Sequence, residues 1–572
     1  MTLIPPPGPR SAVTLRRLSA IALMMSIAAC GGGGGSDAPA TGPAPAPTPS
    51  PPPPPPPPPP SSGPYAITGK AVYESVPTKT DRTGLDYAAA TDKPIRGATV
   101  QLLGAGSAVL ATTTTDTAGN YSVTLPTSQP VTIRVRAEMK RTGSASGDRD
   151  FTVLDNTSTN ALYVLDSATF TPTTAAVTQN VRAASGWGGT SYTTTRAAGP
   201  FALLDVVYEA QAKVATVAPT MTLPPLKVFW SVNNRPTAGD RTLGLIGTSF
   251  FTVTASGRAL YVLGAADTDT DEYDTHVIAH EFGHYLQNAV SRDDSVGGAH
   301  SRNDQLDARV AFSEGWGNGW SGIVFANPLY TDTFGARQAM GFNIDVSVAA
   351  TGIDRGWFSE TTAQYLIWKT NETTGFGPVY TALTTFPSSP AFSSLYTFAA
   401  AVKAASPANA ATITTLFTNQ QVSTQDAFGT GETNNGGVAA AAPALPVYKT
   451  HMAALGAAQN YCVTASVDPR NDQNKLGEFV YIRFPVTATR SYTLTVVKTS
   501  PAGAAVTDPD FTLLKLDGTT VDAVSASDSL MPPSVNDTET LTVTLPTGTH
   551  TIALSDFKLA SPNTSCFNFT VN

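Results

Sequence analysis

The stretch His280-Glu281-Phe282-Gly283-His284 constrains this chain more than any other. On an α-helix, residues four positions apart lie on one face about a turn apart, so the two imidazoles can converge on one metal ion. Glu281 lies beside that face, where its carboxylate can take a proton from a water activated by the metal. Two imidazole ligands suit Zn²⁺, and a catalytic zinc needs a third protein ligand with a fourth position left open. The pattern therefore predicts a helix that carries part of a zinc site.

A second stretch supplies candidates for the third ligand. Residues 307–325 have the spacing of a helix, and Glu314 lies on one side of it, 30 residues after His284. Three glycines would let this helix pack close to the first, which would justify their cost of about 1 kcal/mol each; they are Gly315, Gly317 and Gly319. Glu314 is therefore predicted as the third ligand, with His300 and Glu360 as alternatives.

The string Phe312-Ser313-Glu314-Gly315-Trp316-Gly317-Asn318 resembles the third-ligand helix of gluzincin zinc metallopeptidases. The resemblance implies a zincin-like domain in which His280, His284 and Glu314 hold Zn²⁺ and Glu281 is the general base of peptide hydrolysis. Gluzincins often carry an acidic residue four positions after the ligand Glu. Asn318 stands there in this chain, and its amide oxygen can still accept a hydrogen bond from a ligating imidazole.

The residue that stabilises the oxyanion has several candidates. Zincins use a His or Tyr opposite the catalytic Glu, and we favour His300, with Tyr330 and Tyr365 as alternatives. His276 lies one turn before His280 but too far along the helix axis to share its metal. It is predicted to be a buried helix residue or to support a ligand from behind.

An acidic run precedes the first helix and comprises Asp267, Asp269, Asp271, Glu272 and Asp274. A calcium-binding EF-hand loop that started at Asp267 would need Gly at position 272 and Glu at 278, where Glu272 and Ile278 stand. We interpret the run as a solvated loop, with Ca²⁺ binding as the alternative. Asp274 is predicted as the helix N-cap.

The N-terminal residues carry export signals. A basic segment with Arg16 and Arg17 precedes a short apolar stretch, and Ile27-Ala28-Ala29-Cys30 resembles the bacterial lipobox, in which the Cys is lipidated. An ordinary signal peptide cut near Ala29 is the alternative. Residues 30–64 are rich in Gly and Pro and include ten consecutive prolines, which predicts a stiff tether. The protein is therefore expected in the outer membrane, at the cell surface or in the periplasm, anchored to the membrane by lipid on Cys30.

Short alternating strands with turn residues surround the central region. The signatures Pro94-Ile95-Arg96-Gly97-Ala98 and Thr117-Ala118-Gly119-Asn120-Tyr121 resemble the carboxypeptidase regulatory-like β-sandwich. The strands after residue 457 resemble the bacterial pre-peptidase C-terminal β-sandwich. Cys462 and Cys566 form an even pair once Cys30 is set aside, so a disulfide is predicted between them.

These patterns predict a multidomain protein, with an α+β zincin-like catalytic domain flanked by two all-β sandwich domains. The predicted segments are a signal peptide (1–29), a tether (30–64), a first β region (65–185), the catalytic domain (186–456) and a second β region (457–572). The net charge of −8 argues against nucleic-acid binding, so the expected partner is a protein or peptide substrate. The alternatives are a non-catalytic adhesin or glycan-binding protein with a structural zinc, and a zinc hydrolase that acts on a non-peptide bond.

Overall fold

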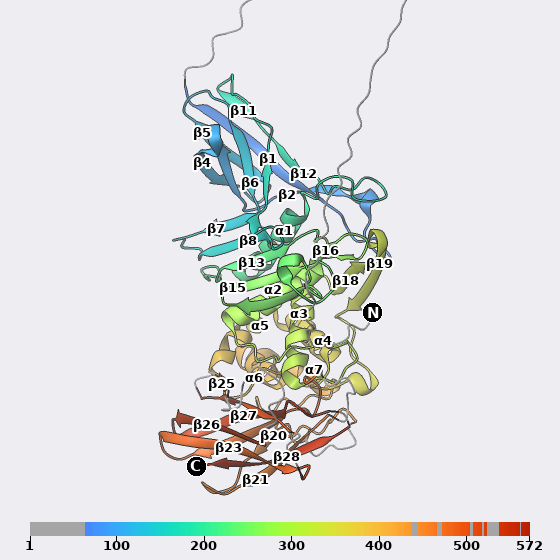
Figure 1. Ribbon diagram of the computed structural model, residues 1–572, viewed down its shortest axis with the longest axis vertical. Coiled ribbons are helices and arrows are strands. Elements are labelled where there is room, and N and C mark those ends of the chain that lie inside the picture. The colour runs from blue at the N-terminus through green and yellow to red at the C-terminus, as the bar shows by residue number, and fades with distance from the viewer. Residues whose placement is uncertain are drawn as a thin grey trace, which may run out of the picture. The chain divides into compact units, whose positions relative to one another are not determined.

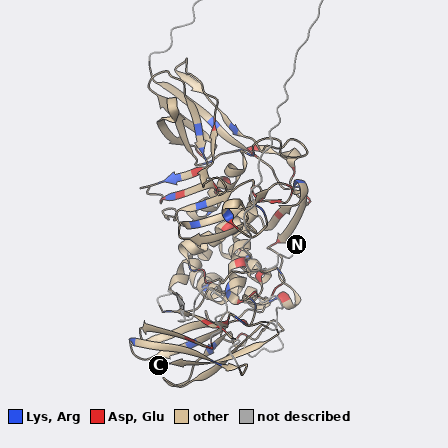
Figure 2. Ribbon diagram, viewed as in Figure 1, with Lys and Arg blue, Asp and Glu red and all other residues tan. Residues whose placement is uncertain are grey.

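The computed structural model describes residues 63–437, 444–465, 472–503, 507–516, 520–522, 537–560 and 562–572, which form several β-sheets and seven α-helices (Figure 1). The predicted signal peptide, Cys30 and nearly all of the predicted tether lie outside the described residues. No helix in the described ranges combines the length and apolar character needed to cross a membrane. Lys, Arg, Asp and Glu are sparse along the ribbon (Figure 2).

The first β region contains two sheets. One joins β1 (Tyr65–Ser75), β2 (Thr91–Pro94), β5 (Asn120–Leu125), β11 (Ala176–Thr178) and β12 (Val181–Ala183). The other has the order β10 (Val164–Asp166), β6 (Thr132–Arg136), β3 (Thr99–Leu103) and β4 (Val109–Thr114). Alternate residues point inward, as Ile67, Val100 and Ile133 do, and they are fully buried. The region is β-rich, as the period-two pattern predicts.

The central sheet has the order β14 (Phe250–Thr254), β15 (Gly257–Val262), β13 (Leu226–Trp230), β8 (Arg149–Asp155) and β7 (Glu138–Arg141), with β9 (Ala161–Leu162) beside β8. Strand β8 runs parallel to β13 and also contacts the first metal-site helix, because the Phe151 ring lies edge-on to Phe282 and Tyr285. Residues 138–155 therefore share a sheet with residues 226–262, which differs from the expected division at residue 185. A strand pattern shows that a strand exists but not which sheet it joins.

Seven helices follow in chain order, and α3 lies between α2 and α4 in the centre of the helical part. Their bounds are α1 (Gly199–Ala215), α2 (Thr275–Val290), α3 (Ala308–Phe325), α4 (Glu360–Thr374), α5 (Phe376–Thr385), α6 (Leu395–Ala405) and α7 (Ala410–Asn419). Helix α3 begins after Asp307, whose carboxylate accepts a hydrogen bond from the Arg309 N–H at 3.0 Å. Because α3 lies against α2, the two helices that carry the predicted ligands are adjacent.

Asp274 occupies the N-cap position of α2, as predicted, but its side chain does not cap the helix. Its carboxylate accepts hydrogen bonds from the Thr333 N–H at 2.8 Å and from the Thr333 hydroxyl, and none from the helix. The predicted N-cap position is confirmed, but the side chain joins the helix start to a small sheet instead of bonding to the helix. That sheet has the order β16 (Gly264–Ala265), β17 (Asp269–Thr270), β18 (Leu329–Phe334) and β19 (Met340–Asp345).

The second β region also has two sheets, with its own apolar core, and its first strand, β20, precedes the predicted start at residue 457. One has the order β20 (Tyr448–Thr450), β22 (Val480–Val486), β27 (Gly548–Asp556), β24 (Pro509–Leu514) and β25 (Thr520–Asp522). The other has the order β21 (Gln459–Thr464), β28 (Thr564–Val571), β23 (Arg490–Ser500) and β26 (Thr538–Leu545). Cys462 and Cys566 are paired across β21 and β28 and form a disulfide, which confirms that prediction.

Candidate metal centre

Helices α2 and α3 bring three predicted ligands together. The Nε2 atoms of His280 and His284 lie 3.0 Å apart. Oε2 of Glu314 lies 3.4 Å from the first of these nitrogens and 3.7 Å from the second. One donor atom of each residue lies within 4.8 Å of the others, so the three groups could hold a metal ion.

A glycine allows this close approach. A Cβ at Gly317 would lie only 2.6 Å from Cε1 of His280, so any side chain there would displace the ligand ring. The other two glycines of the helix face α4 instead, because a Cβ at Gly315 or Gly319 would meet Ala363 or Ile367. The expectation that all three glycines serve the contact with α2 is therefore wrong for two of them. Positions 315 and 319 share one face of a helix and position 317 lies on the opposite face.

Asn318 fixes the ring of His280. Its Nδ2 donates to Glu360 Oε1 at 2.7 Å and to Gln364 Oε1 at 3.0 Å, so its Oδ1 faces Nδ1 of His280, 2.8 Å away. An amide oxygen only accepts hydrogen bonds, so Nδ1 of His280 carries the proton and Nε2 keeps its lone pair. Asn318 thus plays the part that the sequence allowed for it.

Ser313 and Asp293 support His284 in a similar way, and sequence reasoning missed both. The Ser313 hydroxyl lies 3.3 Å from Asp293 Oδ2, to which it donates, and 3.2 Å from His284 Nδ1. Because the hydroxyl proton is used on the carboxylate, the oxygen accepts from Nδ1–H of His284. Ser313 directly precedes Glu314 on α3, but nothing in the spacing of the sequence marks Asp293 as its partner.

The two imidazoles therefore direct their Nε2 atoms toward each other. Both Nδ1 atoms hold their protons against Asn318 and Ser313, and two Nε2 atoms 3.0 Å apart repel unless a proton or a metal ion lies between them. Two neutral imidazoles and one carboxylate are also the ligand set of catalytic zinc sites. The residues present fit a zinc ion.

The surrounding carboxylates give this place a negative potential. Burial disfavours a charged imidazole at His284, but Glu314, followed by Glu281 and Asp293, outweighs burial and raises the pKa of His284 to about 9. Burial likewise opposes charge on Glu314, but His300 and His284 hold the pKa of Glu314 well below its usual value. A potential that favours a proton at this point also favours a metal cation.

His300 lies against the candidate ligands, and its environment differs from the one expected. Its Nε2 lies 3.3 Å from Glu314 Oε2 and its Nδ1 lies 3.3 Å from Glu360 Oε2. Despite burial, these two carboxylates raise the pKa of His300 well above its ordinary value. His300 thus lies between Glu314 and Glu360. The two alternatives for the third ligand, His300 and Glu360, therefore form a chain of contacts that supports the Glu314 carboxylate. Its predicted role at the oxyanion stays a prediction.

Glu281 lies between α2 and the edge of the central sheet. Its Oε2 accepts a hydrogen bond from the Phe251 N–H on β14 at 2.7 Å, and its side chain is buried. Burial is the main cause that raises the pKa of Glu281, and the neighbouring imidazoles oppose it. A carboxylate with a raised pKa is a better proton acceptor than one at its ordinary value, as a general base requires.

Of the remaining aromatic candidates, Tyr330 lies near the predicted zinc ligands and Tyr365 makes no ring contact with them. The Tyr330 ring, on β18, lies 6.3 Å from the His280 ring, and burial raises the pKa of Tyr330 well above its ordinary value, which keeps the hydroxyl protonated. Tyr365 lies half-buried on α4 and has no ring contact with the ligands. His276 is buried and its Nε2 lies 3.2 Å from the Asn327 carbonyl oxygen, which agrees with a buried helix residue.

The acidic run before α2 is largely buried, which corrects its interpretation as a solvated loop. Asp271, Glu272 and Asp274 are at most 3% exposed. Glu272 forms an ion pair with buried Arg196, while Asp271 approaches Asp269 and also Asp332 on β18. The run turns inward because its charges find partners far away in the sequence.

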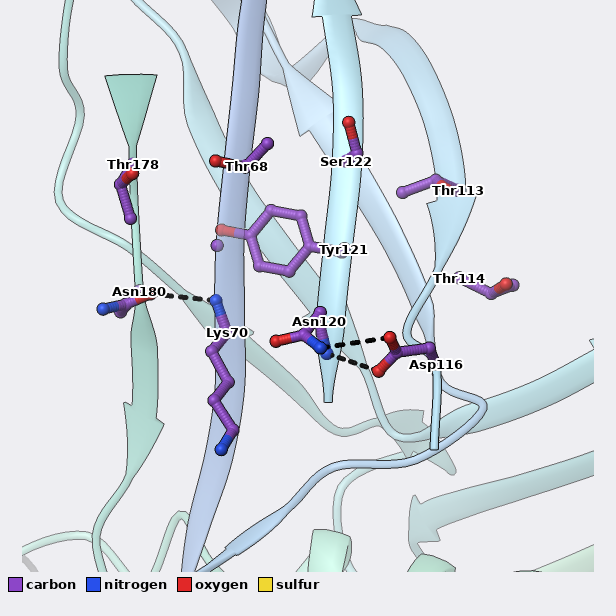
Figure 3. Close-up of a pocket in the computed structure, with 11 residues that line it drawn as sticks. Thr68, Lys70, Thr113, Thr114, Asp116, Asn120, Tyr121, Ser122, Thr178 and Asn180 are labelled. Carbon is purple, nitrogen blue, oxygen red and sulfur yellow. Dashed lines mark hydrogen bonds between the residues drawn. The ribbon is translucent and has the colours of Figure 1, made fainter. Parts of the chain in front are cut away.

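A surface pocket lies elsewhere, on the first β region (Figure 3). Most of the residues that line it are of polar types, among them Thr68, Lys70 and Asn120, and Asp116 accepts hydrogen bonds from Asn120. None of the metal-centre residues lines it. The pocket therefore adds no residue to the candidate centre.

Comparison with known proteins yields limited likeness. No family model matches the chain, and no curated protein matches it. Among solved structures, the pre-peptidase C-terminal domain of collagenase from Bacillus anthracis is similar over 22% of this chain and 94% of its own, with 5% identity and a TM-score of 0.15. PliG of Aeromonas hydrophila, a periplasmic inhibitor of g-type lysozyme, is similar over 22% of this chain and 96% of its own, with 11% identity and a TM-score of 0.12. Scores this low carry no conclusion about activity.

Proposed function

We propose that this chain is a zinc-dependent endopeptidase with a zincin-like catalytic domain, exported and held at a membrane by lipid on Cys30. The observation that carries the proposal is the pair of imidazole Nε2 atoms, which face each other 3.0 Å apart with a Glu314 oxygen beside them. Zn²⁺ bound by these three residues would supply a Lewis acid that polarises the scissile carbonyl and makes water more acidic.

The chain's own residues then handle the proton. Glu281 takes a proton from the attacking water on its carboxylate and passes it to the nitrogen of the leaving amine. The Phe251 N–H holds one oxygen of that carboxylate, and the other makes no hydrogen bond to a described residue. Glu281 is therefore oriented through one oxygen and can exchange the proton through the other.

Tyr330 is better suited than His300 to stabilise the oxyanion. Its hydroxyl stays protonated, makes no hydrogen bond to a described residue and belongs to a ring beside His280. An O–H donor aimed at the developing negative charge lowers the barrier because the donor is already in position. His300, in contrast, is engaged by Glu314 and Glu360 and acts in this proposal by positioning the ligand carboxylate.

The edge of β14 supports a peptide as the substrate. Among the described strands β14 pairs only with β15, so its other edge is open beside Glu281. Because the Phe251 N–H points to this edge, the backbone groups of Val253 point there as well. An extended peptide can add to such an edge through main-chain hydrogen bonds, which brings its carbonyl groups along Glu281.

The substitution Glu281→Gln tests the proposal in the full chain. The variant is expected to keep one zinc per chain and to lose roughly 10²- to 10⁴-fold in cleavage of a peptide library, since proton transfer alone is removed. Glu372→Gln, an exposed residue that pairs with Lys369, is the control and should cleave like the unsubstituted protein. Zinc binding without any chelator-sensitive cleavage by the unsubstituted protein would favour a non-catalytic adhesin, and cleavage of a non-peptide bond would identify another hydrolase.

A further inference from the structure

Three carboxylates converge beside the start of α2, apart from the candidate zinc ligands. Asp269 lies on β17, Asp271 on the segment that leads into α2, and Asp332 on β18. One oxygen of each lies within 4.8 Å of the others. We propose that these three aspartates bind a calcium ion, which fastens β17 and β18 to the segment that begins α2.

Each carboxylate leaves one oxygen unpartnered in the interior. Oδ1 of all three residues is buried and has no hydrogen-bond partner among the described residues. Asp271 is only 3% exposed, and its Oδ2 accepts from the Ser249 hydroxyl, so the free Oδ1 belongs to a fully enclosed side chain. No Lys or Arg in the described ranges pairs with the three residues. Burying unpaired like charges is costly, so the arrangement calls for a cation.

The raised pKa values of these carboxyl groups also support a bound cation. Burial, with repulsion from Asp269 added, raises the pKa of Asp332 to about 7, and burial raises the pKa of Asp269 to about 6 against the opposing effect of a hydrogen bond with Asp271. The three groups therefore resist being ionised together in the interior. A divalent cation among their oxygens removes that resistance, because it attracts all three carboxylates at once.

The donor set selects a hard cation. All donors are oxygens, whereas zinc sites in proteins are dominated by nitrogen and sulfur. Calcium takes six to eight oxygens at about 2.3–2.6 Å in a flexible geometry, and carboxylates are among its usual ligands. Magnesium demands a smaller, nearly ideal octahedron. Asp274 stays outside the set, since its carboxylate is used by Thr333.

The site bears on the metal centre through β18. Tyr330 lies two residues before Asp332, on the same face of the strand, and its ring is beside that of His280. Asp274, three residues after Asp271, binds Thr333 and directly precedes α2. A bound calcium would thus set where α2 starts and where Tyr330 stands, although calcium binding itself does not depend on the proposed peptidase activity.

The test uses the full chain, freed of metals by chelator and dialysis and then given one equivalent of ZnCl₂. Titration calorimetry with CaCl₂ is expected to show one calcium per chain, and thermal unfolding is expected to shift upward in CaCl₂ but much less in equal MgCl₂. The variant Asp332→Asn should lose at least tenfold in calcium affinity. Asp354→Asn, outside the cluster, is the matched control and should bind like the unsubstituted protein.

A comparison of the two proteins in chelator and in CaCl₂ distinguishes a bound calcium ion from carboxyl groups that share protons. In chelator at pH 8 the unfolding temperature of Asp332→Asn should equal or exceed that of the unsubstituted protein, because one repelling charge is gone. In CaCl₂ the order should reverse. An unsubstituted protein that binds no calcium overturns the proposal whether or not the variant folds. An equal response to MgCl₂ overturns the choice of calcium.

Discussion

The Asn318→Asp substitution tests the hydrogen bonds behind His280 most sharply. An acidic residue is common at this position in gluzincins, so the resemblance alone suggests that the change should be harmless or helpful. In this chain Asn318 Nδ2 lies 2.7 Å from Glu360 Oε1 and 3.0 Å from Gln364 Oε1. The substitution replaces that donor with a carboxylate oxygen and brings two carboxylates together in the interior.

The expected cost follows from the proton that the new pair must bind. Two ionised carboxylates about 3 Å apart repel by about 5 kcal/mol at an effective dielectric constant of 20. Taking up one proton avoids this repulsion, and for a carboxyl with an ordinary pKa near 4 it costs about 4 kcal/mol at pH 7 and about 1 kcal/mol at pH 5. The loss of stability equals the smaller of these two energies, which is the cost of protonation. The variant should therefore unfold about 4 kcal/mol more easily at pH 7 and recover most of that as the pH falls to 5, since protons then bind the folded pair readily.

The assay is urea unfolding of the zinc-free protein at both pH values, with zinc affinity measured by competition against a chromophoric chelator. The double variant Asn318→Asp with Glu360→Gln is the internal control, because the new amide at position 360 can donate to the new carboxylate. It should regain most of the lost stability and bind zinc at least as well as the unsubstituted protein. Glu360→Gln alone completes the cycle and accounts for the lost contact with His300. A single variant as stable as the unsubstituted protein at pH 7 would refute this reasoning.

Two further predictions concern the same helices. Gly317→Ala should weaken zinc binding by at least tenfold, measured by the same competition, because the added Cβ displaces the His280 ring; an unchanged affinity would show that the ring can shift without cost. Burial lowers the pKa of His276 to about 4, below the ordinary 6.5. As the pH falls, the unfolded chain therefore binds a proton at His276 before the folded chain does, which favours unfolding. The free energy of unfolding should therefore drop by about 3 kcal/mol more between pH 7 and pH 4 in the unsubstituted protein than in His276→Gln. Equal pH dependence of the two proteins in urea titrations would contradict the buried, neutral state of His276.

The helices of the centre were predictable because their signals are local. The four-residue spacing of His280 and His284 requires one helical face, and the structure has α2 over Thr275–Val290. The stretch predicted to start at Asp307 begins α3 one residue later, with Asp307 as its cap. Both predictions depend on patterns within about twenty residues, where the geometry of the backbone leaves few choices.

The partners behind the ligands could not be predicted, because distant segments supply them. Asp332 joins Asp269 only through the pairing of β17 with β18, whose register no short pattern reveals. The acidic run has many charges and was therefore interpreted as solvated, yet Glu272 is buried against Arg196, 76 residues earlier. Charged residues enter an interior only with a partner, and the sequence does not state which partner the fold will bring.

The ligand helix is also joined to the second β region. The Tyr481 hydroxyl lies 2.6 Å from Asp307 Oδ2, and the Arg309 guanidinium stacks over the Phe479 ring at 4.3 Å. Asn474 Nδ2 donates to the Gly297 carbonyl, in the loop that carries His300, at 2.8 Å. The N-cap of α3 and the loop behind Glu314 are therefore held from outside the helical part. Because a buried carboxylate that loses such a donor is left unsatisfied, the second β region is part of what keeps Glu314 in place rather than an independent appendage.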